Sequence, residues 1–161
     1  MRSKPAKIAG ILSIIFGLIF IVAGGVTWGV VTSQLKAENI TVPGDSDLLP
    51  GAQVQGPISA YAQAQTINKH ALAATDGKTY AELGKMATEA EEAGDTEAAE
   101  TYTQQRATVM NASFLRASLF TSVVAYGIAL LVVGLGIILI INGIAFNSLA
   151  KGARRTEPVD A

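Results

Sequence analysis

Two long stretches without a charged side chain constrain this chain more than any other feature of its sequence. Residues 8–35 and 117–150 contain no Asp, Glu, Lys or Arg, whereas residues 36–116 hold 17 of the chain's 25 charges. A helix rises 1.5 Å per residue, so about 20 residues cross a hydrocarbon core of roughly 30 Å. Both stretches exceed that length, and residues 11–30 and 122–141 contain 12 and 13 Ile, Leu, Phe or Val. The sequence therefore predicts an all-α membrane protein with two transmembrane helices, at residues 8–35 and 117–150.

The basic residues ahead of the first stretch also resemble the start of a secretory signal. The apolar part of such a signal has about 7 to 15 residues and ends at a small-x-small site. This stretch has 28 residues, and residues 30–37 contain no A-x-A pattern. A membrane-anchored helix is therefore the favoured interpretation, and a cleaved signal is the alternative.

Basic residues flank both stretches on the side of the chain ends. They are Arg2, Lys4 and Lys7 before the first stretch, and Lys151, Arg154 and Arg155 after the second. Basic residues beside short segments stay in the cytoplasm, whereas a segment longer than about 60 residues can be translocated whatever its charge. We expect a multi-pass plasma-membrane protein with cytoplasmic tails at residues 1–7 and 151–161. Residues 36–116, with a net charge of −5, are expected to be extracytoplasmic.

Small side chains recur along one face of each stretch. In lipid, small residues that let two backbones approach are the main sequence signal for helix association. A seven-residue repeat gives a nearly straight stripe, and left-handed packing at about 20° keeps two such stripes in contact. We therefore expect an antiparallel hairpin of the two helices, although glycine is also common in membrane helices for other reasons. The candidate packing residues are Gly10, Ser13, Gly17 and Gly24 in the first helix, and Ser122, Ala129, Gly136 and Gly143 in the second.

Gly25 and Gly29 form a separate small-xxx-small pair that could bind a further helix, including a copy of the same chain. Trp28, near the outer end of the first stretch, fits an aromatic anchor at the membrane surface or a side chain that packs against the neighbouring helix. Neither stretch contains an ionisable Asp, Glu, Lys, Arg or His. A proton relay or ion path through one subunit therefore lacks the residues that it usually needs.

The segment between the stretches begins with a connector. Residues 39–57 contain three prolines and three glycines, a density that excludes a helix there and favours extended or turn structure. Pro57 suits the first position of a helix that ends at Asp76-Gly77. One face of that predicted helix carries Ala60, Ala64, Ile67, Ala71 and Ala74.

A second short helix and one long helix follow. Thr79 can cap a helix that runs to Gly94, and from Glu97 no proline or glycine interrupts the sequence before Gly127, inside the second span. We predict one continuous helix that extends outward from that span. The segment has 16 alanines and only 17 larger apolar side chains, so its short helices are expected to pack on the long helix or on a partner rather than fold alone. Residues 88–101, rich in Ala, Glu and Thr, are expected to be solvated and mobile.

The residues needed for most site chemistry are absent from the sequence. There is no cysteine, which excludes disulfides, thiol catalysis and cysteine-ligated metals. His70 is the one histidine, and no acid lies three or four residues from it on a helix, so a surface histidine is favoured over a metal ligand. A net charge of −1 argues against nucleic acid as a partner. We expect no catalytic, cofactor-binding or metal-binding residues, and therefore no cofactor.

Three segments of the sequence resemble a family of small actinobacterial membrane proteins with two spans and an outward loop. They are AENITV, GPISAYAQAQTINKHALAATDGKTYAEL and RATVMNASFLRASLFTSVVAYG. The resemblance covers residues 36–85 and 106–146 most clearly, whereas residues 88–101 look longer than expected for the family. Members are often labelled aromatic ring-opening dioxygenases. The resemblance therefore implies a two-span fold and, through that label, ring-opening activity.

Extradiol ring cleavage typically uses iron held by two histidines and a carboxylate. This chain offers one histidine, and no outer pocket large enough to bury a catechol beside such a centre is expected. The leading hypothesis is therefore a non-enzymatic accessory, scaffold or interaction protein whose partners are the lipid bilayer, other envelope membrane proteins or its own copies. The sequence indicates no small-molecule substrate. The alternatives are the dioxygenase of the family label and an extracytoplasmic ligand-binding or sensory module.

Overall fold

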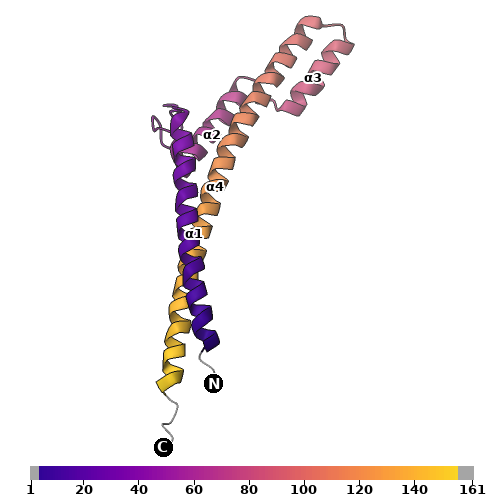
Figure 1. The fold of residues 1–161 in the computed structure, drawn as a ribbon. Helices are drawn as coiled ribbons and strands as arrows, with labels where there is room; N and C mark the ends of the chain where they lie inside the picture. Colours follow the sequence, from indigo (N-terminus) through magenta and orange to yellow (C-terminus); the bar gives the residue numbers. More distant parts are fainter. Residues whose placement is uncertain (1–3, 156–161) are drawn as a thin grey trace, which may run out of the picture. The chain divides into compact units, whose positions relative to one another are not determined.

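The regular structure is helical. The computed structural model describes residues 4–155, with side chains to Gly152, and within them it has four helices: α1 (Lys4–Ala37), α2 (Pro57–Ala73), α3 (Tyr80–Glu92) and α4 (Thr96–Arg155) (Figure 1). The prediction of an all-α chain is confirmed, and so is the single unbroken helix from residue 96 onward. Arg2 and residues 156–161 lie outside the described residues, as do the side chains of Arg154 and Arg155, which were predicted to flank the second span.

The chain forms two compact units. Residues up to 31 and from 125 onward make one, here called the two-helix unit, and residues 32–124 make the other, here called the central unit. Most of α1 and the C-terminal part of α4 build the two-helix unit. The central unit contains the connector, α2, α3 and the first part of α4.

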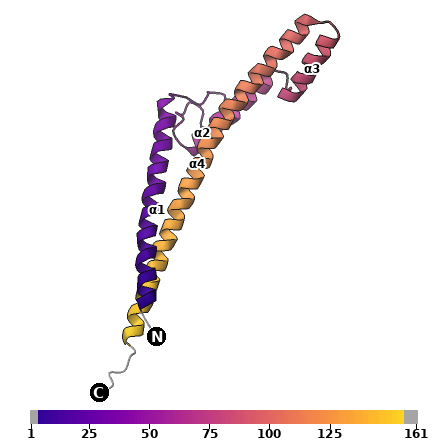
Figure 2. The same cartoon turned by 45° about the vertical axis from the view of Figure 1, so that its right-hand side comes forward.

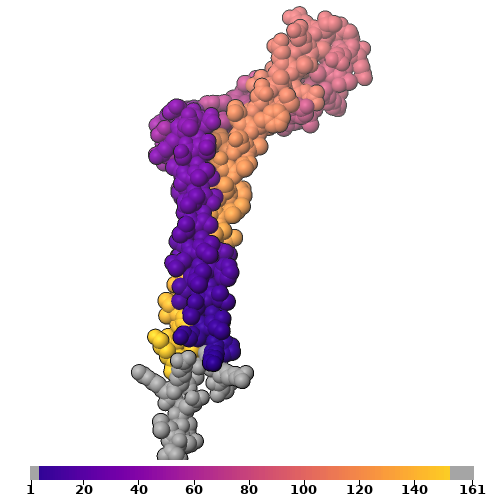
Figure 3. Space-filling model, in the orientation of Figure 1, coloured from indigo at the N-terminus to yellow at the C-terminus, as the bar shows by residue number. Residues whose placement is uncertain are grey.

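The two-helix unit is apolar over most of its surface. Both α1 and α4 are long and apolar enough to cross a membrane, with mean hydropathies of 2.5 and 2.9 over their most apolar windows. Only 17% of each window is buried. The two helices lie side by side, with the beginning of α1 and the end of α4 at the same end of the unit (Figures 1 and 2). The space-filling view shows α1 covering the front of this unit with α4 beside it (Figure 3).

The connector between α1 and α2 is not helical, as predicted. Its backbone folds back on itself, because Val42 N–H donates to the Ala52 carbonyl and Val54 N–H donates to the Ile40 carbonyl, both at 2.9 Å. Thr41 and Gln53 form an isolated antiparallel bridge between these bonds. Val42 and Val54 are fully buried and anchor the connector in the core of the central unit.

Local hydrogen bonds explain where α2 begins and ends. Pro57 takes its first position, and Ser59 Oγ accepts the N–H groups of Gln55 and Gly56 at 3.0 and 3.1 Å. At the other end Gly77, with φ of +78°, donates to the Leu72 carbonyl at 2.7 Å. This backbone conformation favours glycine and satisfies a carbonyl of the last turn. The predicted start and stop are thus confirmed, except that Ala74 caps α2 rather than belonging to it.

A capping box starts α3. Thr79 donates its backbone N–H and its hydroxyl to Glu82 Oε2, each at 2.7 Å, and Thr79 Oγ1 accepts the Glu82 N–H at 3.4 Å. The backbone hydrogen bond from Thr79, aided by its hydroxyl, lowers the pKa of Glu82 below its ordinary value of 4.5. Gly94, with φ of +77°, ends the turn after α3, and Asp95 Oδ1 then caps α4 by accepting the Ala98 N–H.

Both short helices pack on the first part of α4, as predicted from their alanine content. The Arg106 guanidinium of α4 lies 4.2 Å from the centre of the Tyr80 ring of α3. The Tyr61 ring of α2 meets Phe120 of α4 edge-on, with centroids 6.1 Å apart. Residues 88–101 form the end of α3, a turn and the start of α4, and most of their side chains are exposed. Their solvated position is confirmed, whereas their mobility stays a prediction.

Candidate functional site

Close contact between glycine backbones joins α1 to α4 in the two-helix unit. Gly10, Gly17, Gly136 and Gly143 are all buried. A Cβ built on Gly17 would lie 2.6 Å from the Gly136 carbonyl oxygen, and one built on Gly136 would lie 2.7 Å from that of Gly17. Likewise, a Cβ built on Gly10 would lie 2.8 Å from the Gly143 carbonyl oxygen, and one built on Gly143 would lie 2.6 Å from that of Gly10. Real Cβ atoms essentially never come this close, so only glycine fits these positions without a shift of the helices.

The contacts repeat every seven residues. A Cβ on Gly24 would lie 2.7 Å from the Ala129 carbonyl oxygen, so Gly24 and Ala129 continue the series. Each step of seven residues forward along α1 is matched by a step of seven back along α4. A seven-residue period corresponds to 3.5 residues per turn, which is the repeat of left-handed helix pairs. We call this set the glycine seam; its members are Gly10, Gly17, Gly24, Ala129, Gly136 and Gly143.

A larger side chain from the opposite helix occupies the space beside each seam glycine. The Ile140 side chain lies against Gly17, and the Ile21 side chain lies against Gly136. The other pairs are Asn147 against Gly10, Ile14 against Gly143 and Val133 against Gly24. A small residue thus forms each hole and a large one from the other helix fills it, which is how close-packed helix pairs are built.

The remaining predicted packing residues lie elsewhere. Ser13 is half-buried, and the half-buried Ser122, in the central unit, donates its hydroxyl to the Ser118 carbonyl at 3.4 Å. Gly25 and Gly29 are exposed, and a Cβ on either would meet nothing within 4 Å. The Gly25 and Gly29 pair is therefore not part of the glycine seam. Its predicted contact with a further helix stays a prediction.

An aromatic contact follows the seam along α1. The rings of Trp28 and Tyr126 meet edge-on with centroids 4.6 Å apart and planes at 65°. Tyr126 is buried, whereas 39% of Trp28 is exposed. Trp28 therefore packs against the neighbouring helix, which was one of its two interpretations, and its exposed part leaves the role of membrane anchor as a prediction.

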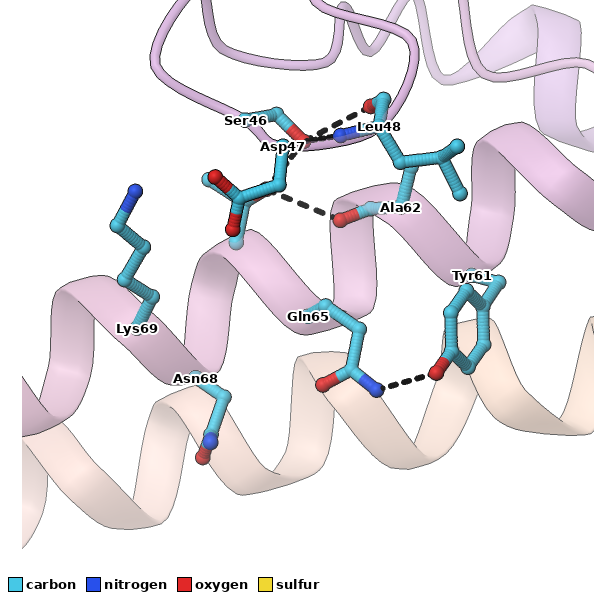
Figure 4. Close-up of a pocket in the computed structure, with 9 residues that line it drawn as sticks. Ser46, Asp47, Leu48, Tyr61, Ala62, Gln65, Asn68 and Lys69 are labelled. Atoms are coloured by element: carbon cyan, nitrogen blue, oxygen red, sulfur yellow. Dashed lines mark hydrogen bonds between the residues drawn. The ribbon is translucent and has the colours of Figure 1, made fainter.

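A pocket with a mixed polar and apolar lining lies in the central unit, between the connector and α2. Its volume is about 430 Å³, and no histidine lines it, so the expectation of no pocket for a catechol beside an iron centre stays a prediction. Figure 4 shows Asp47 and Leu48 of the connector on one side and Tyr61, Gln65, Asn68 and Lys69 of α2 around the other. The lining residues are Ser46, Asp47, Leu48, Tyr61, Ala62, Gln65, Thr66, Asn68 and Lys69.

Hydrogen bonds hold both sides of the pocket in place. Thr66 Oγ1 donates to Ser46 Oγ at 2.9 Å, which ties α2 to the connector, and Ser46 Oγ donates to the Leu48 carbonyl at 2.8 Å. On α2 itself, Gln65 Nε2 donates to the Tyr61 hydroxyl at 2.8 Å (Figure 4). Four of the lining side chains are therefore held in place before any ligand arrives: Ser46, Thr66, Tyr61 and Gln65.

His70 has an acidic partner that comes from the connector. Its Nε2 lies 2.7 Å from Asp45 Oδ2, and Lys69 Nζ donates to the Asp45 carbonyl at 2.9 Å. The hydrogen bond with His70 is the main cause that lowers the pKa of Asp45 below its ordinary value of 3.8, and the charges of His70 and Lys69 act in the same direction. About half of each side chain in the His70–Asp45 pair is exposed. The surface position predicted for His70 is confirmed, and its interaction is with the connector.

Within residues 4–155, no three His, Cys, Asp or Glu side chains lie close enough together to hold a metal ion. Comparison of the chain with protein-family models, with curated proteins and with solved structures found no match. The resemblance to the two-span family and the activity in its label both stay predictions.

Sequence reasoning missed the pocket and the Asp45–His70 pair for the same reason. Asp45 lies 25 residues before His70, and Ser46 lies 20 residues before Thr66. No helical or strand period relates such positions, because an irregular connector brings them together. The one available signal was the density of Asp, Ser and Pro in residues 43–50, which marks a structured turn but not its partner.

Proposed function

We propose that the chain is an integral plasma-membrane protein that acts as a non-enzymatic accessory or scaffold of the cell envelope. In this proposal α1 and the C-terminal part of α4 form an antiparallel transmembrane hairpin. Both ends are cytoplasmic, and residues 36–116 are extracytoplasmic. The partners are the lipid bilayer and either other envelope membrane proteins or further copies of this chain.

The glycine seam is the observation that carries the proposal. A helix in the core of a soluble protein would be mostly buried, yet the most apolar windows of α1 and α4 are only 17% buried. Such surfaces need lipid or further helices around them. Lipid tails provide no hydrophobic force between helices, so backbone contact through glycine is the main means of holding a pair together there. The seam supplies that contact.

The charges support the proposed orientation. Lys4 and Lys7 stand at the start of α1 and Lys151 near the end of α4, at one end of the two-helix unit. Positive residues beside membrane helices stay on the cytoplasmic side. The acidic segment between the spans then lies outside the cell.

The scaffold role rests on what the surfaces offer. Gly25 and Gly29 leave an open, backbone-exposed strip on α1 that a further helix could approach. His70, the one imidazole, is already paired with Asp45 in holding the connector, so a structural role accounts for it. Packing surfaces are thus present, and the His70–Asp45 pair serves the fold.

Single cysteines test the orientation, because the native chain has none. Ala93→Cys in the turn after α3 should react with a membrane-impermeant maleimide in intact cells. Lys151→Cys near the end of α4 should react only after the membrane is opened. Both positions are exposed, so burial does not mask either thiol. Reaction of Lys151→Cys in intact cells would contradict the proposed orientation, as would recovery of the protein in the soluble fraction.

Affinity purification in mild detergent tests the scaffold role. The native chain should bring down a partner protein or its own copies, and Gly29→Leu should lose that partner because its side chain fills the open strip. Val30→Leu is the matched control, since Val30 is exposed on α1 at 55% but points about 100° around the helix from Gly29, away from the strip. Isolated monomer under several detergent conditions would count decisively against a scaffold.

A further inference from the structure

The pocket between the connector and α2 offers hydrogen-bonding groups that the fold does not use. Within residues 4–155, the Asp47 carboxylate and the Asn68 amide form no hydrogen bond or ion pair. Gln65 uses one amide N–H on Tyr61 and keeps its carbonyl oxygen for another donor. A carboxylate that accepts and amides that both donate and accept therefore surround one cavity of about 430 Å³.

The lining also presents an aromatic ring in a fixed position. Tyr61 is 42% exposed, so part of its ring is open to a ligand. Its edge contact with Phe120 and its hydrogen bond from Gln65 restrain it. Leu48 extends the apolar side of the lining, and it is 41% exposed. The pocket thus combines one flat apolar surface with several uncommitted polar groups.

The charges in the pocket limit the class of ligand. Lys69 is the one cation of the lining, and its Nζ lies 2.9 Å from the Asp45 carbonyl and 3.9 Å from the Asp45 carboxylate. Asp47, from the connector, adds a negative charge that has no partner within residues 4–155. Phosphates and other anions are therefore disfavoured. A purely apolar ligand is also disfavoured, because it would leave the polar lining unpaired.

We propose that this pocket binds a short neutral saccharide. Sugar hydroxyls both donate and accept hydrogen bonds, which suits the Asp47 carboxylate and the Asn68 and Gln65 amides. The C–H face of a pyranose ring suits stacking on Tyr61. A cavity of this size falls within the range of roughly 300 to 1,000 Å³ that is usual for small ligands. The inference rests on the proposed function in placing the pocket outside the cell, where glycans of the envelope would be its source.

Saccharide binding is measured on the full chain in a detergent without a sugar headgroup, such as lauryldimethylamine oxide. The probes are two neutral trisaccharides, chitotriose and maltotriose, titrated by saturation-transfer-difference NMR. At least one should give saturable transfer, strongest at the ring C–H protons that face Tyr61. No saturable transfer from either probe overturns the proposal. The orientation experiment with Ala93→Cys is separate, so failure here leaves the membrane assignment standing.

Two variants place the binding in the pocket. Asp47→Asn should weaken it about tenfold, the usual effect of losing one hydrogen bond to a charged group, whereas Asp76→Asn on the exposed turn after α2 should leave it unchanged. Tyr61→Ala should abolish stacking, and Tyr61→Phe should retain binding within about threefold because the ring remains. Asp47→Asn alters only an exposed side chain, so it still measures the contribution of the pocket to saccharide binding even if Tyr61→Ala weakens the fold. Binding that survives both Asp47→Asn and Tyr61→Ala overturns the proposal.

Discussion

Replacing one hydrogen atom by a methyl group tests the glycine seam directly. In Gly17→Ala, the new Cβ would lie 2.6 Å from the Gly136 carbonyl oxygen and 2.7 Å from Ile140 Cγ1. One of these neighbours is backbone and cannot rotate away, so α1 and α4 must separate by roughly 0.8 Å to reach ordinary van der Waals contact. A gap of this size forfeits about a quarter to a half of the dispersion energy at each contact that it opens.

The expected magnitude combines this loss with helix propensity. Overpacking of a close contact costs about 1 to 3 kcal/mol. Alanine is better than glycine inside a helix by about 1 kcal/mol in water, which acts in the opposite direction. Gly25→Ala is the matched control, because a Cβ on Gly25 meets nothing within 4 Å. The propensity gain is common to both variants, so the difference between them isolates the seam and should be about 1 to 3 kcal/mol.

Unfolding of the purified protein in mixed micelles with increasing dodecyl sulfate gives the free energies. Trp28 is the only tryptophan of the chain and lies against Tyr126 in the same helix pair, so its fluorescence follows the separation of α1 from α4. Gly17→Ala should unfold at a lower dodecyl sulfate fraction than the native chain, and Gly25→Ala should not. If the two variants differ by less than about 0.5 kcal/mol, the size expected of an uninvolved surface change, the seam does not hold the pair together.

Three further changes concern the central unit. Thr79→Ala removes the α3 cap and should cost about 1 kcal/mol, seen as faster amide exchange in the first turn of α3; unchanged exchange would show that the cap is dispensable. Tyr80→Ala removes the ring beneath Arg106 and should destabilise the contact of α3 with α4 by about 0.5 to 1 kcal/mol, measured in the same exchange experiment; an effect confined to α2 would contradict the packing described. Pairing with His70 holds the pKa of Asp45 below 3.8. The connector should therefore resist proteolysis above pH 3.8 and become cleavable as the pH falls through the lowered pKa of Asp45, because the protonated carboxyl no longer pairs. Asp45→Asn should be cleaved at neutral pH as well, and equal cleavage of both proteins at neutral pH would refute the role of this pair.

The helices were predictable because each depends on signals that are local in sequence. Gly77 and Gly94 end α2 and α3 with positive φ, and Thr79 begins α3 through a side chain three residues from its partner. The length of α4 followed from the absence of proline and glycine over residues 97–126. Each of these features acts within one helical turn or along one helix, so neighbouring residues are sufficient to reveal it.

The glycine seam was only partly predictable. The seven-residue spacing placed Gly10, Gly17 and Gly24 on one face of α1, but spacing cannot tell a glycine that packs from one that does not. Gly25 fits a small-xxx-small pattern as well as Gly17 does, yet it faces open space. What distinguishes the two is the register of α4, because Gly136 lies opposite Gly17, whereas no described atom of α4 lies within 4 Å of a Cβ built on Gly25. Register is a relation between two helices, and a single helix does not encode it.

Packing of the helix pair and the proposed saccharide binding can be tested separately, because they depend on different residues. The seam draws its residues from the two-helix unit, whereas the pocket draws its residues from the connector and α2 in the central unit. No residue or hydrogen-bond partner belongs to both sets, and effects at sites without shared partners usually add. A seam variant such as Gly17→Ala should therefore change the unfolding of the helix pair while a pocket variant such as Asp47→Asn changes only saccharide binding. The opposite result, in which either change alters both measurements, would mean that α4, the element common to both units, carries strain from one to the other.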